Sequence, residues 1–149
     1  MVTQLNKIKK ERLEVAVWGI GAYYKGDNGT DKTQDFINQG FACIGWSEND
    51  APALYQMIKS VKIGDIIYIK SFTPKQNQIY IKAVGVVIDS FDNYDSLGYG
   101  VKVKWKSNFN EYIPINVTPE MYKNNVFNNT MYEEYNKSII SKLIEIIMA

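Results

Sequence analysis

The chain has 149 residues, is 46% hydrophobic and 13% aromatic, and carries a formal net charge of +1, as expected for one globular domain with a sizeable apolar core. It has no histidine and one cysteine, Cys43, which we expect in the core; this excludes histidine-based nucleophile pairs, an internal disulfide and a zinc site, so we expect no metal and no cofactor. The small net charge excludes a polycation, so any contact with nucleic acid has to come from a local patch of lysines.

Residues 1–13 are rich in charge and predict a weak helical lead-in. They lack the apolar core of a signal peptide. No apolar run in the chain approaches the ~20 residues that span a bilayer. We therefore expect a cytoplasmic protein that does not enter a membrane.

The first half of the chain predicts strands that alternate with helices. Residues 14–21 (EVAVWGIG) are apolar on both faces, as in a central strand. Residues 22–33 have the Gly-, Asp- and Asn-bearing composition of a loop that carries function on a rigid scaffold. A short helix then ends at Gly40, and residues 41–46 (FACIGW) form a compact apolar strand.

A second helix and a hairpin follow. Asp50 is a good N-cap residue, and the apolar residues after it recur at helical spacing. Residues 66–72 and 79–88 are rich in β-branched side chains and flank a polar connection, which predicts an antiparallel hairpin. Gly85 interrupts the second strand, where a missing side chain marks a bulge, a bend or the close approach of another backbone.

The last third predicts a loop, two strands and a helix. Residues 89–98 are polar, and residues 99–106 alternate with period two, with Trp105 on a buried face and lysines on the other. Residues 112–117 predict a further short strand. From Asn129 onward, apolar residues recur at helical spacing: Tyr132, Tyr135, Ile139, Leu143, Ile146 and Ile147.

These elements predict one α+β domain over residues 1–149, a small, bent, mixed β-barrel with packed helices and an extra C-terminal helix. The extra helix carries more apolar surface than one face needs. It either docks on the sheet of its own chain or forms an interaction surface for a second copy or an effector protein.

Six landmarks occur in a defined order: VWGIG at 17–21, FINQG at 36–40, IGW at 44–46, IGD at 63–65, VGVV at 84–87 and VKVKW at 101–105. In this order they resemble the PUA-like superfamily, and within it the EVE-type domains, including those attached to modification-dependent restriction enzymes. The resemblance implies a small bent barrel. In EVE and the related YTH domains it also implies a pocket that holds a flipped or single-stranded modified base between aromatic side chains.

Carried over by position, the resemblance places around this pocket Trp18 and the residues after it, Trp46 with Ser47, and the hairpin residues Lys70, Ser71 and Phe72. In an aromatic-rich protein, Trp18 and Trp46 are equally compatible with the core. Since stacking on an aromatic ring contributes ~1–3 kcal/mol per base, the choice between pocket and core decides what the domain can bind.

The residues themselves add further candidates. Tyr23 and Tyr24 lie in a Gly-bearing polar loop, which favours a functional role, so we predict them in the pocket wall. Asp27 and Asn28, from the same loop, are predicted to contact the edge of the base, together with Ser47 and Ser71.

Three lysines are predicted to hold the phosphates that flank the base: Lys70, Lys102 and Lys104. The last two belong to the lysine face of residues 99–106. The alternative for that face is a solvated sheet surface whose lysines deter edge-to-edge aggregation.

The predicted function is therefore a nucleic-acid-binding module that reads a modified base of DNA or RNA, in restriction or phage defence. One alternative is a binder of a free nucleotide or signalling small molecule in the same pocket. Another is an amidohydrolase of the related ASCH branch, acting on a modified nucleoside, because Lys25, Thr30, Lys32 and Glu48 lie in comparable loops. We rank catalysis below binding and predict no catalytic residue.

Overall fold

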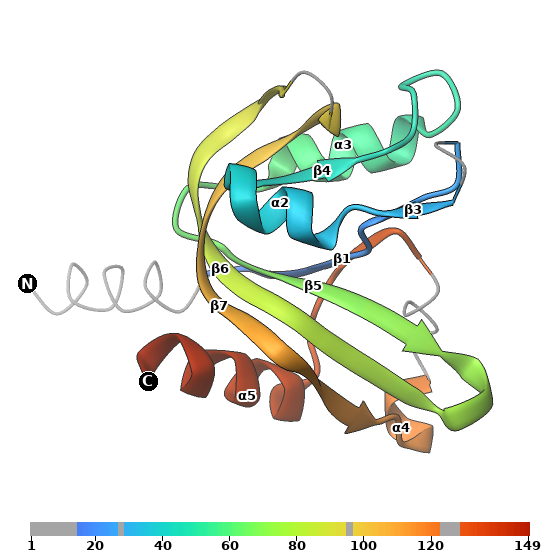
Figure 1. The fold of residues 1–149 in the computed structure, drawn as a ribbon, viewed down its shortest axis with the longest axis vertical. Coiled ribbons are helices and arrows are strands. Elements are labelled where there is room, and N and C mark those ends of the chain that lie inside the picture. Colours follow the sequence, from blue (N-terminus) through green and yellow to red (C-terminus); the bar gives the residue numbers. More distant parts are fainter. Residues whose placement is uncertain (1–14, 27–28, 95–96, 123–128) are drawn as a thin grey trace, which may run out of the picture.

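A computed structural model describes residues 15–26, 29–94, 97–122 and 129–149 (Figure 1). The predictions for residues 1–13, Asp27 and Asn28 lie outside the described residues. In chain order the elements are β1 (Val17–Ile20), β2 (Tyr23–Tyr24), β3 (Thr30–Asp31), α2 (Thr33–Gln39), β4 (Phe41–Ile44), α3 (Pro52–Ser60), β5 (Ile66–Thr73), a 3-10 turn (Pro74–Gln76), β6 (Gln78–Asn93), β7 (Tyr99–Asn116), α4 (Pro119–Tyr122), β8 (Met131–Glu133) and α5 (Lys137–Met148).

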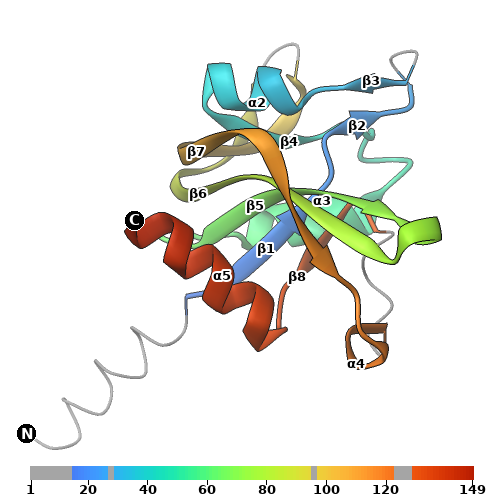
Figure 2. The same ribbon diagram turned by 60° about the horizontal axis from the view of Figure 1, so that its bottom comes forward.

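Most strands join one six-stranded sheet in the order β4-β7-β6-β5-β1-β8, and β2 pairs separately with β3. β1 runs parallel to β5, whereas the other neighbours in the sheet are antiparallel. Because β6 and β7 are long and bent, the sheet curls into a half-barrel (Figures 1 and 2). The prediction of an α+β domain with a bent, mixed sheet is confirmed.

The sheet carries an apolar cluster on each face. On one face α2 and α3 cover the cluster, in which Phe36 is fully buried. On the other face α5 covers the cluster, with Leu143 packed in the same group as Tyr68. In β1, Val17 belongs to the second cluster and Trp18 to the first, which confirms that this strand is apolar on both faces.

The carboxylate of Asp65 joins β1 to the start of β5. It accepts hydrogen bonds from the indole Nε1 of Trp18 at 3.0 Å, from the backbone nitrogen of Lys62 at 2.9 Å and from that of Ala16 at 3.2 Å. Asp65 is 5% exposed, so its carboxylate has lost most of its hydrogen bonds to water. The three protein hydrogen bonds compensate for that loss. The sequence contains Gly64-Asp65 as a landmark but gives no sign that the carboxylate is buried.

Gly85 lies where β6 bends against β7. The pairing of the two strands shifts register between Val84 and Gly85. A Cβ atom at Gly85 would lie 2.6 Å from the carbonyl oxygen of Lys104, which is closer than real Cβ atoms approach. The prediction of a bulge and a close backbone approach at this glycine is confirmed.

β6 and β7 are longer than the sequence predicts. β6 continues to Asn93, through the first part of the predicted loop 89–98, and β7 runs to Asn116 through the predicted separate strand 112–117. Register shifts along the pair let the ladder bend without ending. Each bulge also interrupts the period-two pattern, so the sequence suggests a strand end where the strand only changes direction.

α3 begins later than predicted. Its first helical residue is Pro52, its N-cap residue is Ala51, and no side chain caps it, so the prediction of Asp50 as the N-cap is wrong. Proline at the first helical position has a suitable φ angle and needs no hydrogen-bond acceptor for a backbone N–H. The side chain of Asp50 is thus available for another role.

The C-terminal segment is divided between a strand and a helix. Tyr132, predicted in the helix, lies in β8 opposite Gly19 of β1, because the edge of β1 offers backbone hydrogen bonds that outweigh the helical periodicity. α5 starts only at Lys137, where the side chain of Asn136 accepts a hydrogen bond from the backbone nitrogen of Ile139 at 3.0 Å.

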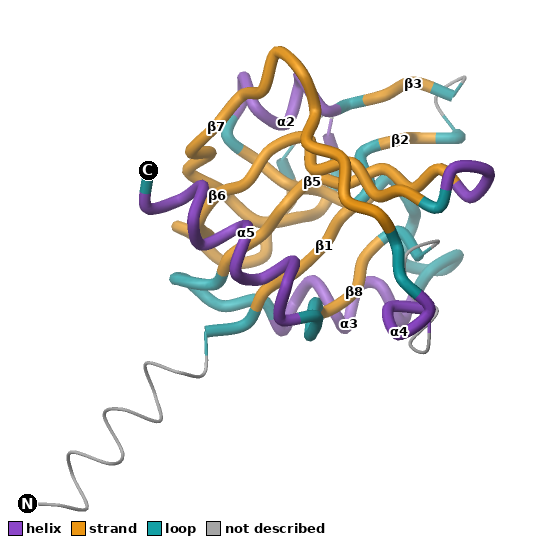
Figure 3. Tube along the Cα trace, turned by 90° about the horizontal axis from the view of Figure 1, so that it is seen from below, coloured by secondary structure: helices purple, strands orange, loops and turns teal. Residues whose placement is uncertain are grey.

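α5 lies across β6 and β7 and buries Ile139 and Leu143 against them (Figure 3). It therefore docks on the sheet of its own chain. Its outer side still exposes Ile144 and Met148, and an interaction with a second copy or an effector stays a prediction. None of the helices in the described part of the chain is long and apolar enough to cross a membrane.

We expect Gly85→Ala to destabilise the fold by about 1–3 kcal/mol, the usual cost of overpacking, because the added methyl group meets the backbone of β7. For a domain of this size the unfolding temperature should fall by about 3–10 °C. Gly26→Ala is the matched control, since a Cβ atom there meets nothing within 4 Å. Thermal unfolding followed by circular dichroism measures both, and equal unfolding temperatures would contradict the close approach.

Candidate ligand pocket

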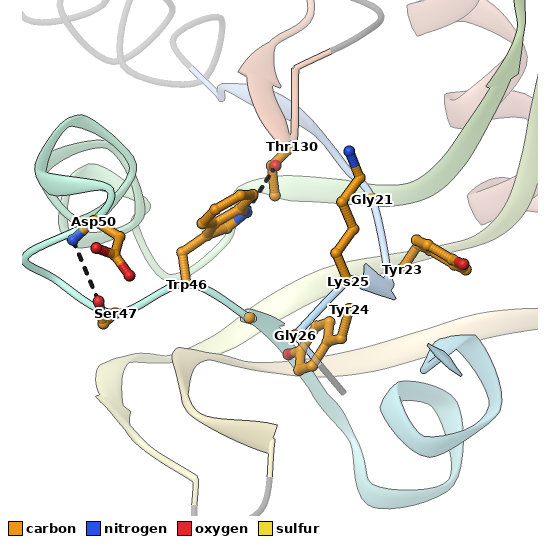
Figure 4. Close-up of a pocket in the computed structure, with 10 residues that line it drawn as sticks. Gly21, Tyr23, Tyr24, Lys25, Gly26, Trp46, Ser47, Asp50 and Thr130 are labelled. Atoms are coloured by element: carbon orange, nitrogen blue, oxygen red, sulfur yellow. Dashed lines mark hydrogen bonds between the residues drawn. The ribbon is translucent and has the colours of Figure 1, made fainter. Parts of the chain in front are cut away.

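A cavity of about 180 Å³ opens where the end of β1, the β2 segment and the loop after β4 meet the residue before β8. Its volume is several times that needed for one water molecule, which suits a small ligand. The lining residues, shown in Figure 4, are Gly21, Tyr23, Tyr24, Lys25, Gly26, Gly45, Trp46, Ser47, Asp50 and Thr130.

Backbone contacts bring these distant segments together. The backbone nitrogen of Gly21, just after β1, donates to the carbonyl oxygen of Thr130 at 2.7 Å. The ring of Tyr24 packs against the backbone at Gly45, where a Cβ atom would lie 2.7 Å from the ring. A glycine at position 45 is therefore needed for β2 to approach the end of β4.

Trp46 is the most prominent aromatic residue of the cavity, with 44% of its surface exposed. Its indole Nε1 donates to the hydroxyl of Thr130 at 3.3 Å, and its carbonyl oxygen accepts from the hydroxyl of Tyr55 at 2.8 Å. These bonds hold both the backbone and the far edge of the ring. Trp46 thus presents a large, oriented aromatic surface to solvent.

Tyr24 forms a second and more rigid wall. Its hydroxyl donates to the carbonyl oxygen of Leu97 at 2.7 Å, and its ring contacts Phe36 edge-on with centroids 6.1 Å apart. Burial raises the pKa of Tyr24 above its ordinary value, so the ring stays neutral. Lys32 lies over the same ring, 5.9 Å from its centroid. Neighbouring Tyr23 is 61% exposed at the rim.

Polar side chains complete the lining. The backbone nitrogen of Asp50 donates to the hydroxyl of Ser47 at 3.2 Å, which orders the turn that carries both residues. The Asp50 carboxylate only accepts hydrogen bonds, and the Lys25 ammonium only donates them. With the hydroxyl of Thr130, the cavity offers donors and acceptors around an aromatic surface.

The structure brings four of the predicted pocket residues together at this cavity: Tyr23, Tyr24, Trp46 and Ser47. Trp18 does not line it, because its side chain is 6% exposed and bound to Asp65; it belongs to the core. Ser71 and Phe72 lie near the end of β5, outside the lining, and Phe72 packs against the cluster under α5. Lys102 and Lys104 are exposed on β7 and do not line the cavity either.

Sequence reasoning missed two lining residues that carry polar groups. Asp50 had a signal, but its position before a helix was interpreted as capping. Thr130 had none, because it lies 84 residues from Trp46 in the chain and reaches it only through the pairing of β8 with β1.

Lys70 lies behind the cavity wall and is only 7% exposed. Its ammonium Nζ donates to the carbonyl oxygen of Asn129 at 2.7 Å and lies 5.5 Å from the ring centroid of Tyr132. Burial, with a smaller contribution from the charge of Lys82, lowers the pKa of Lys70 to about 8. This buried position supports the segment before β8 and differs from the exposed phosphate contact that the sequence predicted.

The residues considered for catalysis do not form one group at the cavity. Lys25 lines it, whereas Glu48 pairs with Lys59 at 3.8 Å. Thr30 belongs to β3, and Lys32 lies over the ring of Tyr24.

The fold, rather than the sequence, links this chain to known proteins. No family model matches the sequence, and no curated protein gives a significant match. Three solved structures are similar: protein Atu2648 from Agrobacterium tumefaciens (TM-score 0.54, 9% identity, 88% of this chain and 92% of that chain), a hypothetical protein from Leishmania major (0.51, 9%, 91% and 96%) and Rpa0253 from Rhodopseudomonas palustris (0.51, 10%, 89% and 92%). At this identity the likeness shows the fold alone.

We expect the buried ammonium of Lys70 to make the stability depend on pH above about 8. Below that pH the lysine is charged in both states, and the folded state bears the desolvation cost. Between about 8 and 10.5 the folded state releases the proton first, so the unfolded state binds more protons and stability rises with pH. Relative to Lys70→Met, the wild type should gain on the order of 1–3 kcal/mol across this range.

Urea unfolding at several pH values between about 7 and 10 measures this difference. Lys104→Met, which removes an exposed lysine of β7, is the matched control and should keep the wild-type pH dependence. Parallel stability curves for the wild type and Lys70→Met would show that the ammonium is not desolvated.

Proposed function

We propose that this protein binds a modified nucleobase, flipped from a duplex or presented in single-stranded DNA or RNA, in the cavity lined by Trp46 and Tyr24. The oriented, 44% exposed ring of Trp46 carries the proposal. A base that stacks on an aromatic ring gains ~1–3 kcal/mol. Such a gain offsets the few kcal/mol needed to remove a base from its stack.

The polar lining supports the recognition of a base edge. The carboxylate of Asp50 is an acceptor for the exocyclic amino group of cytosine or adenine. The ammonium of Lys25 and the hydroxyl of Ser47 supply donors for ring nitrogens or carbonyl oxygens. We therefore expect bases derived from cytosine or adenine to bind more tightly than bases derived from thymine or uracil.

The curled mixed sheet, with helices on both faces, is compatible with the PUA-like, EVE-type fold that the sequence landmarks resemble. We propose that the chain belongs to this superfamily, with the cavity at Trp46 as its base pocket. A role in restriction or phage defence rests on that resemblance. It would follow from base recognition, because such systems distinguish modified from unmodified nucleic acid.

We expect short single strands that carry one methylated cytosine or methylated adenine to bind, and Trp46→Ala to weaken their affinity about 5- to 150-fold, the equivalent of one lost stacking contact. Fluorescence anisotropy of end-labelled strands measures this without depending on tryptophan emission. Trp105→Phe is the matched control, because Trp105 bonds to the carbonyl oxygen of Phe36 and does not line the cavity. If no modified or unmodified strand binds the wild type, the proposal is wrong.

The prediction that Lys102 and Lys104 hold phosphates has a distinct test. Replacing both by Gln should reduce the slope of log affinity against log salt by about 1.4 on single strands, about 0.7 for each phosphate contact. Lys62→Gln with Lys137→Gln removes the same charge at exposed positions elsewhere and serves as the control. An unchanged slope in the Lys102 and Lys104 variant would assign these lysines to a solvated sheet surface.

A further inference from the structure

A second hollow is also lined by Trp46. This groove has a volume of about 460 Å³, larger than the cavity, and it runs between α3 and the segment that leads into β8. The groove and the cavity share Trp46, Asp50 and Thr130. Figure 4 shows the indole ring between Asp50 on one side and Lys25 on the other. Trp46 therefore lines both hollows.

The lining of the groove differs from that of the cavity. Its apolar residues are Ala51, Ala53, Leu54, Met57 and Met131. Among the described residues that line it, the only charged side chain is the carboxylate of Asp50, and none is basic. The groove therefore disfavours a phosphate group of a ligand and favours a flat, apolar part of a ligand. Since stacking faces are common to every base, such a groove would accept a base with little regard to its identity.

We propose that the groove holds the base adjacent in the strand to the base in the cavity, and that Trp46 is a wedge between them. The inference rests on the proposed function of the cavity. Proteins that kink DNA often insert an apolar side chain between base steps and partly unstack them. Here the wedge replaces the missing stacking partner of the neighbouring base.

The spacing of the two bases sets the kind of strand that fits. Stacked bases lie about 3.4 Å apart along one strand, so a ring between them requires about twice that distance. A single strand or a flipped nucleotide reaches this separation with its backbone extended, whereas a duplex first has to be unstacked at that step. The ligand is thus an oligonucleotide of at least two adjacent bases rather than a free nucleotide, and single strands bind better than duplexes.

The test compares strands that differ by one neighbouring base. The probes are a short single-stranded DNA with one central methylated cytosine, the matching RNA with one central methylated adenine, and versions of each in which the nucleotide on one side or the other is abasic. Loss of the base on one particular side should weaken binding to the wild type about tenfold, as for one stacked base. Loss on the other side should have a smaller effect.

Ala53→Glu places a larger, charged side chain in the groove from an exposed position of α3, away from the cavity lining. In this variant the intact strand should bind as weakly as the abasic one, and the abasic strand should bind as it does to the wild type. Gln56→Glu adds the same charge on the same helix outside both hollows and should retain the full difference.

Equal affinity for intact and abasic strands on both sides, with binding still lost in Trp46→Ala, would overturn the groove proposal and leave the cavity as the base site. A tenfold difference that persists in Ala53→Glu would also overturn it, because the neighbouring base would then bind elsewhere. Absence of binding by every strand would overturn the proposed function and the groove proposal together.

Discussion

The buried carboxylate of Asp65 is the interaction on which the placement of β1 depends. β1 has only four residues and lies between β5 and β8, so its own ladder offers few hydrogen bonds. Asp65 adds bonds to Ala16 at the start of this strand and to the indole of Trp18 within it. A buried carboxylate without hydrogen-bond partners would destabilise the fold. The burial of Asp65 therefore favours the arrangement of β1 that supplies these donors. Strand β1 is thereby held at one end while its other end leads to the cavity.

The cavity forms where the end of β1, the loop after β4 and the residue before β8 lie beside one another. Gly21 follows β1 and binds the backbone of Thr130, which precedes β8. The ammonium of Lys70 donates a hydrogen bond to the carbonyl oxygen of Asn129, the residue before Thr130. Trp46, which follows β4, donates a hydrogen bond from its indole to the hydroxyl of Thr130. The site is thus assembled from strand ends, where side chains leave the ladder and face solvent while their backbone stays positioned.

A polar cluster under α5 stabilises the same edge of the sheet. The hydroxyl of Tyr68 donates to the carboxylate of Glu134 at 2.6 Å and lies 2.7 Å from the hydroxyl of Tyr132. Burial raises the pKa of Glu134 and of both tyrosines, which is consistent with a cluster removed from water. Gly19 leaves room for the ring of Tyr132, since a Cβ atom there would lie 2.6 Å from it. The short strand β8 is fixed by these side chains as much as by its ladder.

Features that depend on neighbours along the chain can be predicted from the sequence. Two runs of β-branched side chains that flank a polar connection predict the hairpin strands β5 and β6, and the need for a left-handed residue predicts the end of α2 at Gly40, whose φ is 79°. Loop composition predicts Tyr23 and Tyr24 in the wall of a pocket, and both line the cavity. Which of the two tryptophans lines the cavity depends on the tertiary structure. Trp18 is buried and donates a hydrogen bond to Asp65, whereas Trp46 lies at the surface and donates to Thr130. Burial of a single side chain depends on the register and curl of strands that are distant in sequence, and local periodicity carries no information about either.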